Sequence, residues 1–128
     1  IMVETVKFMS WNVCGLNTYI KRYRVLSYTC REKAQIALLQ ETHLTEEESQ
    51  KLHKKWRGQM YSSTYSSYTR RVMIWIEQQV PFQTQYINAE IEGRFLLVYG
   101  WLDGRELCIV RFYAPNLDDR MFFHTIKQ

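Results

Sequence analysis

The chain has 128 residues, of which 46% are hydrophobic and 15% aromatic, so it can bury the core of one domain, spanning residues 1–128, and does not read as disordered. Its net charge of +4 fits a polyanionic partner and fits an ordinary basic surface equally well. The three cysteines form no C-x-x-C pair, which argues against a disulfide framework or a zinc site and favours an intracellular protein of the nucleus or cytoplasm. We see no signal-peptide pattern and no apolar stretch near the ~20 residues of a membrane helix, so we expect no membrane partner.

A first helix is expected to follow a strand-like run at residues 6–13. Gly15 interrupts that run, and Asn17 or Thr18 can cap a helix that reaches about Lys33. The apolar residues expected to share its buried face are Ile20, Tyr23, Leu26 and Cys30. A short apolar run at residues 36–39 then predicts a strand buried on both faces, as in parallel sheets.

A second helix is indicated by a capping box and by its charges. Thr45 and Glu48 form the box, acidic residues crowd the first turn, and basic residues precede a stop at Gly58. Leu52 and Trp56, four residues apart, are expected to form its buried stripe.

The rest of the chain reads mainly as strands. These are expected at residues 59–64, 72–77, 83–92, 95–102 and 106–113. Asp103-Gly104 between two apolar runs predicts a hairpin turn. A last short helix is expected to begin at Asp118 or Asp119 and to carry Met121, Phe122 and Ile126. The order β-α-β-α followed by mostly antiparallel strands indicates a mixed α/β domain.

Polar side chains follow three of the strand-like runs, in the strings Ser-Trp-Asn-Val-Cys-Gly-Leu, Leu-Gln-Glu-Thr-His and Tyr-Ala-Pro-Asn. Glu41 would place a carboxylate at the rim of a sheet, where it could hold Mg²⁺ or be a solvated acid before a helix. Asn12 could donate to a phosphate oxygen or belong to a turn. Tyr113 could donate to a non-bridging phosphate oxygen or pack in the core.

Two further residues are weaker candidates. His43 follows Glu41 by two residues, so it could touch a phosphate on the same side or be a surface histidine. Asn116 is typical of a turn after Pro115. The basic face of the first helix could steer a polyanion or be a solvated face.

Taken together, the three strings resemble the endonuclease/exonuclease/phosphatase superfamily, which includes DNase I, exonuclease III and the apurinic endonucleases. They are most similar to the endonuclease domain of LINE-type retrotransposon ORF2 proteins, and the resemblance covers nearly the whole chain. It implies that Glu41 is a metal ligand for Mg²⁺ (or Mn²⁺), that Asn12 belongs to the active-site hydrogen-bond network, and that Tyr113 contacts the scissile phosphate. His43 and Asn116 fall where this family touches the DNA backbone. The implied reaction is Mg²⁺-dependent hydrolysis of phosphodiester bonds in DNA.

The resemblance also implies a fold, of which this chain would supply about half. We expect an α/β domain that is about half of a DNase I-like sandwich: one mixed, mainly antiparallel sheet with helices on its outer face. The opposite face of that sheet would then lack a partner. Such a face would favour self-association.

The sequence departs from the family pattern in its catalytic residues. It contains no Asp-x-Asn motif, which holds the attacking water in the family, and no Ser-Asp-His motif, which supplies a carboxylate and the catalytic histidine. Arg71 and Arg111 stand where the family usually has Gly and often has Asn. We therefore expect weak or absent hydrolysis by this truncated domain alone. Two alternatives stay open: a non-catalytic retroelement-derived remnant that at most binds nucleic acid, and a phosphoesterase acting on a small phosphoester.

Overall fold

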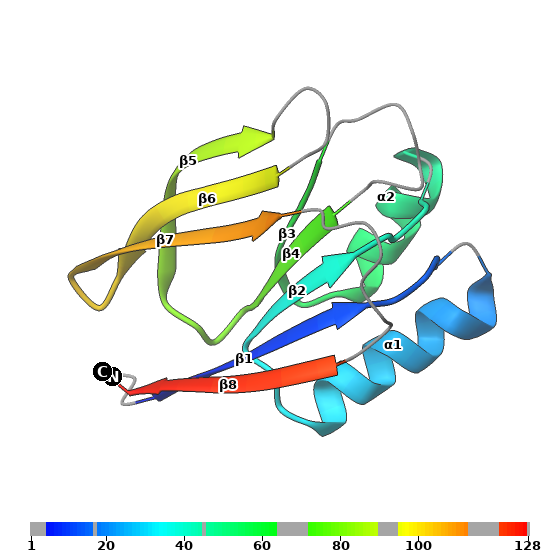
Figure 1. Cartoon of the computed structure of the whole chain (residues 1–128), viewed down its shortest axis with the longest axis horizontal. Helices are drawn as coiled ribbons and strands as arrows, with labels where there is room; N and C mark the ends of the chain where they lie inside the picture. Colours follow the sequence, from blue (N-terminus) through cyan, green and yellow to red (C-terminus); the bar gives the residue numbers. More distant parts are fainter. Residues whose placement is uncertain are drawn as a thin grey trace.

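A computed structural model of the chain describes residues 5–16, 18–44, 46–63, 72–89, 95–112 and 121–127; for Glu46 and residues 121–127 it describes the backbone alone. Neither helix in these ranges is long and apolar enough to cross a membrane. These residues fold into two sheets, with two helices on the first of them (Figure 1).

The larger sheet has five strands in the order β3-β4-β2-β1-β8. Their bounds are β1 Thr5–Asn12, β2 Ile36–Gln40, β3 Gly58–Ser62, β4 Val72–Glu77 and β8 Met121–Lys127. β1 and β2 are parallel, and the other pairs are antiparallel. The parallel pair sits near the middle of the sheet, which is why β2 is apolar on both faces, as the sequence predicted.

The smaller sheet has three antiparallel strands in the order β5-β6-β7. They are β5 Phe82–Ala89, β6 Phe95–Leu102 and β7 Arg105–Phe112. β6 and β7 form the predicted hairpin, since Leu102 pairs with Arg105 across the Asp103-Gly104 turn. Both turn residues have positive φ, 50° and 77°, which explains why Asp-Gly occurs there.

The two predicted helices are present. They are α1 Tyr19–Arg31 and α2 Glu46–Lys55. Thr18 caps α1, because its hydroxyl accepts a hydrogen bond from the Lys21 N–H at 3.2 Å. Thr45, the other predicted cap, lies outside the described residues. Leu52 and Trp56 are buried as predicted.

Two apolar cores separate three layers. Side chains on one face of the five-stranded sheet, such as Met9, Leu39 and Trp75, pack against the helices. Side chains on the other face pack against the three-stranded sheet, and they include Val6, Ile36, Ile74, Leu96 and Val98. The period-two alternation of the strands therefore sends successive residues into different cores.

Three expectations about the fold were wrong in detail. Residues 121–127 form strand β8, not a helix, because they pair with the otherwise open edge of β1. The strands form two sheets, not one, so the sheet face that we expected to be uncovered is covered by β5–β7. The buried face of α1 contains Val25 and Thr29, whereas Ile20 and Tyr23 are 64% and 61% exposed.

Candidate active site

The carboxyl ends of β1 and β2 meet at one rim of the five-stranded sheet. Asn12 lies beside Gln40 in the parallel register. The pairing continues past both strands, because the N–H groups of Gly15 and Leu16 donate to the carbonyls of Glu41 and Thr42 at 2.6 and 2.7 Å. Backbone hydrogen bonds therefore hold the two following segments against each other. Ligand sites of open α/β sheets form at such ends.

Asn12 and Glu41 contact each other at this rim. Asn12 is only 2% exposed, and its side-chain amide donates a hydrogen bond to Glu41 Oε2. Its Oδ1 accepts from the Cys14 N–H at 3.1 Å. Because both ends of the amide are engaged, Asn12 fixes the position of the Glu41 carboxylate.

The backbone at this rim is strained. Cys14, Glu41 and His43 have φ values of 51°, 57° and 55°, in the left-handed region that residues with a Cβ rarely adopt. Each such residue costs about 1–2 kcal/mol. Strain of this kind gathers where a site needs particular side-chain positions.

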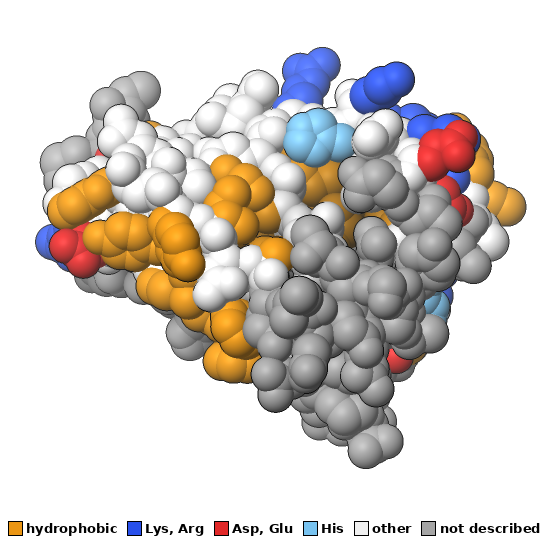
Figure 2. Space-filling model, turned by 90° about the horizontal axis from the view of Figure 1, so that it is seen from above, with side chains coloured by type: hydrophobic (Ala, Val, Ile, Leu, Met, Phe, Trp, Pro, Cys, Tyr) orange, Lys and Arg blue, Asp and Glu red, His pale blue; other side chains and the backbone are white. Residues whose placement is uncertain are grey.

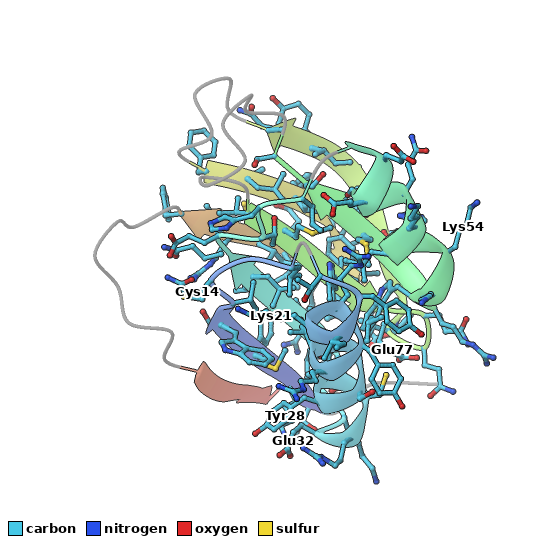
Figure 3. The ribbon with its side chains drawn as sticks, turned by 90° about the vertical axis from the view of Figure 1, so that its right-hand side faces the viewer. Cys14, Lys21, Tyr28, Glu32, Lys54 and Glu77 are labelled. Carbon is cyan, nitrogen blue, oxygen red and sulfur yellow. The ribbon has the colours of Figure 1, made fainter. Side chains whose placement is uncertain are left out.

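Two basic residues of α1 hold the segment after β1. Lys21 Nζ donates to the Cys14 carbonyl at 3.1 Å, and Arg22 donates to the Leu16 carbonyl at 3.0 Å. Arg22 also pairs with Glu48 of α2 at 3.4 Å. Figure 3 shows Cys14 and Lys21 near one end of α1, with Tyr28 and Glu32 near the other. Part of the basic face of α1 therefore positions the rim.

A second polar pair lies next to the first. Gln40 is fully buried, and its Oε1 accepts a hydrogen bond from Arg111 Nη2 of β7 at 2.7 Å. Burial lowers the pKa of Arg111. Gln40 is not among the site residues predicted from the sequence, although a polar residue at the end of an apolar run is a usable signal. Arg111 likewise appears among the sequence predictions only as a departure from a family pattern.

The predicted site residues thus have different outcomes. The structure brings Asn12 and Glu41 together. His43 follows them at the same rim, and its Nε2 is buried without a hydrogen-bond partner among the described residues. Tyr113 and Asn116 lie outside the described residues, as does Arg71. The catalytic, metal-binding and DNA-binding roles of all five site residues remain predictions.

A cavity of about 620 Å³ lies away from this rim, at the amino end of β2. Lys33, Lys55 and Arg57 line it together with Glu77 and the edge of Trp56. The three cations follow or end the two helices, where they offset the negative ends of the helix dipoles. We therefore interpret them as structural and keep the candidate site at the Asn12–Glu41 rim.

No model of a protein family matches the chain, but solved structures do. The chain superposes on humanized TDP2 from D. rerio with a TM-score of 0.64, at 22% identity over 83% of this chain and 46% of that one. It superposes on the AP endonuclease LMAP from Leishmania major with a TM-score of 0.65, at 18% identity over 86% and 40%. The chain has a DNase I-like fold.

The DNase I-like fold also appears in the endonuclease domain of TRAS1, a telomere-specific non-LTR retrotransposon. That match has a TM-score of 0.56 at 15% identity, and it covers 89% of this chain and 48% of that one. The chain thus spans less than half the length of these solved structures. The fold implied by the predicted resemblance is confirmed, as is the prediction of about half of a DNase I-like sandwich.

Proposed function

We propose that the Asn12–Glu41 pair is part of a Mg²⁺-dependent site that hydrolyses phosphodiester bonds in DNA. The observation that carries this proposal is the buried Asn12 amide holding the Glu41 carboxylate at the carboxyl ends of two parallel strands. A DNA substrate is favoured by the Gln-Glu-Thr-His-Leu string and by a match to D. rerio TDP2 complexed with a single-strand DNA product, with a TM-score of 0.59 at 24% identity.

The carboxylate of Glu41 is suited to bind Mg²⁺. Mg²⁺ is commonly bound by one or two carboxylates, and water and phosphate oxygens complete its shell. Among the described residues, no group of three His, Cys, Asp or Glu side chains gathers around a common point, so the protein share of the shell would be small. When bound, the cation would neutralise charge that develops on the phosphate.

The remaining described residues would orient rather than react. Asn12 sets the direction of the Glu41 carboxylate, and the Cys14 N–H holds the Asn12 amide in turn. The sequence has neither motif that positions and deprotonates water in the family. General-base assistance is worth ~10²–10⁴ in rate. We therefore propose that this chain by itself hydrolyses DNA weakly or not at all.

Metal binding and nicking test the two parts of the proposal separately. We expect Mn²⁺, as a paramagnetic substitute for Mg²⁺, to bind the purified chain weakly, and we expect Glu41→Gln to abolish this binding. Glu77→Gln, which removes a carboxylate at the other end of the sheet, is the control and should bind normally. Equal Mn²⁺ binding by the Glu41→Gln protein would contradict the metal site.

Nicking of supercoiled plasmid in Mg²⁺ measures the activity itself. We expect the wild-type chain to nick no faster than the Glu41→Gln chain. Nicking by the wild type that disappears in Glu41→Gln would show that this chain is already a working enzyme. It would support the proposed chemistry and overturn the proposed inactivity.

The missing motifs favour one alternative function, a non-catalytic remnant that binds nucleic acid through its basic surface. Such a protein would bind DNA in a salt-dependent manner without any contribution from Glu41 or Mg²⁺. A phosphoesterase for small phosphoesters would instead release phosphate from a small ester and ignore DNA.

We further propose that two copies associate through the outer face of β5–β7. Tyr86 and Phe112 are 55% and 63% exposed there, and Phe95 contacts Phe112 at 6.0 Å between ring centroids. Figure 2, which looks down on the β5 side, shows hydrophobic side chains gathered in a band on the left. In the described part of the chain, β5 and β7 also lack a further partner strand, so a two-fold related copy could cover this sheet.

A further inference from the structure

Arg111 is partly buried and has no acidic partner among the described residues. Its Nη2 donates to the amide oxygen of Gln40 at 2.7 Å, and its Nε is buried with no hydrogen-bond partner in the same ranges. No described carboxylate lies within 4.0 Å of its guanidinium. A guanidinium has five N–H donors, so one bond to a neutral amide leaves most of its capacity unused.

Arg111 points into the space that also contains Asn12. On β1, Val6 and Phe8 face the smaller sheet, and the period of two places Asn12 on that same face. Gln40 lies beside Asn12 in the parallel register and is the residue that Arg111 contacts. The guanidinium therefore reaches from the second sheet to the rim where Asn12 holds Glu41.

A partly buried cation without a counter-ion has lost part of its hydration, and a bound anion would offset that cost. Burial also lowers the pKa of Arg111, because the guanidinium loses hydration that stabilises its charged form. Arginine binds phosphate through two parallel hydrogen bonds, so a phosphodiester would satisfy both the charge and the unused donors.

We propose that Arg111 binds a phosphate of the DNA strand at this rim, and that Gln40 is the positioning residue that aims its guanidinium. This inference rests on the proposed function, because it names a substrate contact of the same site. It is distinct from the proposed metal site, because the contact between Arg111 and the phosphate needs no metal ion. Arg111 would hold the phosphate from the side of the smaller sheet.

The experiment measures binding of a fluorescent single-stranded oligonucleotide by anisotropy, in EDTA, over a series of salt concentrations. We expect Arg111→Gln to weaken binding at least ~10-fold, as for loss of a charge-assisted contact, and to reduce the slope of log K against log salt by about 0.7. Arg105→Gln is the matched control, since Arg105 is exposed at the far end of the same strand. It should change affinity far less. Equal losses in the two variants would overturn the proposal.

Two further measurements serve as controls for loss of folding in the Arg111 variant. In the absence of any anion, Arg111→Gln should unfold no more easily than wild type, because it removes a partly buried charge that has no acidic partner among the described residues. If Arg111→Gln fails to fold, Arg111→Lys replaces it and should bind the oligonucleotide more weakly than wild type, since lysine offers a point charge without the planar fork. Wild-type affinity in Arg111→Lys would then overturn the proposal.

The two proposals fail separately. Loss of Mn²⁺ binding in Glu41→Gln with normal oligonucleotide binding by Arg111→Gln would refute the Arg111 contact alone. Weakened oligonucleotide binding in Arg111→Gln with unchanged Mn²⁺ binding in Glu41→Gln would refute the metal site alone.

Discussion

At the scale of single residues, Asn12 connects the stability of the rim to its chemistry. Its amide is buried and bridges the Glu41 carboxylate and the Cys14 N–H. Asn12→Ala should lower the free energy of unfolding by about 1–3 kcal/mol, because it removes one hydrogen bond to a carboxylate and one to a backbone N–H. Urea denaturation measures the change. Asn88→Ala on β5, where the side chain is only partly buried, should cost clearly less, and equal losses would show that the bridge contributes nothing.

The positive φ values at the rim give a second prediction. Cys14 has φ 51° and an exposed side chain, so Cys14→Gly removes strain and loses little packing. We expect the free energy of unfolding to rise by up to ~1 kcal/mol. Cys108→Gly is the control: Cys108 is also exposed but lies in strand β7, where glycine should destabilise by a similar amount. The same direction of change in both variants would argue that strain at Cys14 is negligible.

At the scale of elements, the β5–β6–β7 sheet depends on two glycines for different reasons. Gly104 has φ 77° and open space where a Cβ would stand, so Gly104→Ala should cost only the ~1 kcal/mol of a left-handed alanine. A Cβ on Gly100 would stand 2.2 Å from the Gln83 carbonyl oxygen and 2.8 Å from the Phe82 ring. Gly100→Ala must therefore push β5 away from β6 and should destabilise much more. Thermal unfolding of the two variants compares them, and a Gly104→Ala loss equal to or larger than the Gly100→Ala loss would be the contrary result.

At the scale of the whole molecule, the described elements leave the outer face of the smaller sheet without a covering layer. If two copies associate there, sedimentation should show a concentration-dependent dimer, and Tyr86→Lys should shift it to the monomer. Tyr19→Lys is the matched control, because Tyr19 is 62% exposed on α1, on the other side of the five-stranded sheet. Monomers at all concentrations, or equal effects of the two lysines, would contradict association through this face.

The types of most elements could be read from the sequence because they depend on neighbouring residues. The Thr18 cap, the Asp103-Gly104 turn and the all-apolar run before Gln40 are local signals, and the structure has the corresponding helix, hairpin and buried strand. The polar strings after the strands were local as well. They predicted that Glu41 stands at the rim of a sheet, and the structure places Asn12 beside it there, because parallel strands end at the same edge of a sheet.

Only the tertiary structure decided the features that depend on residues far apart in the sequence. Residues 121–127 are a strand because β1 offers them an open edge, and α1 buries Val25 rather than Tyr23 because of where the sheet lies. The Arg111–Gln40 hydrogen bond joins residues 71 positions apart on different sheets, and only the packing of those sheets brings them together. Local periodicity limits the conformation of a segment. The free energies of strand pairing and burial, in contrast, depend on two segments at once. The sequence by itself therefore determined most of the elements, and the folded chain determined their partners.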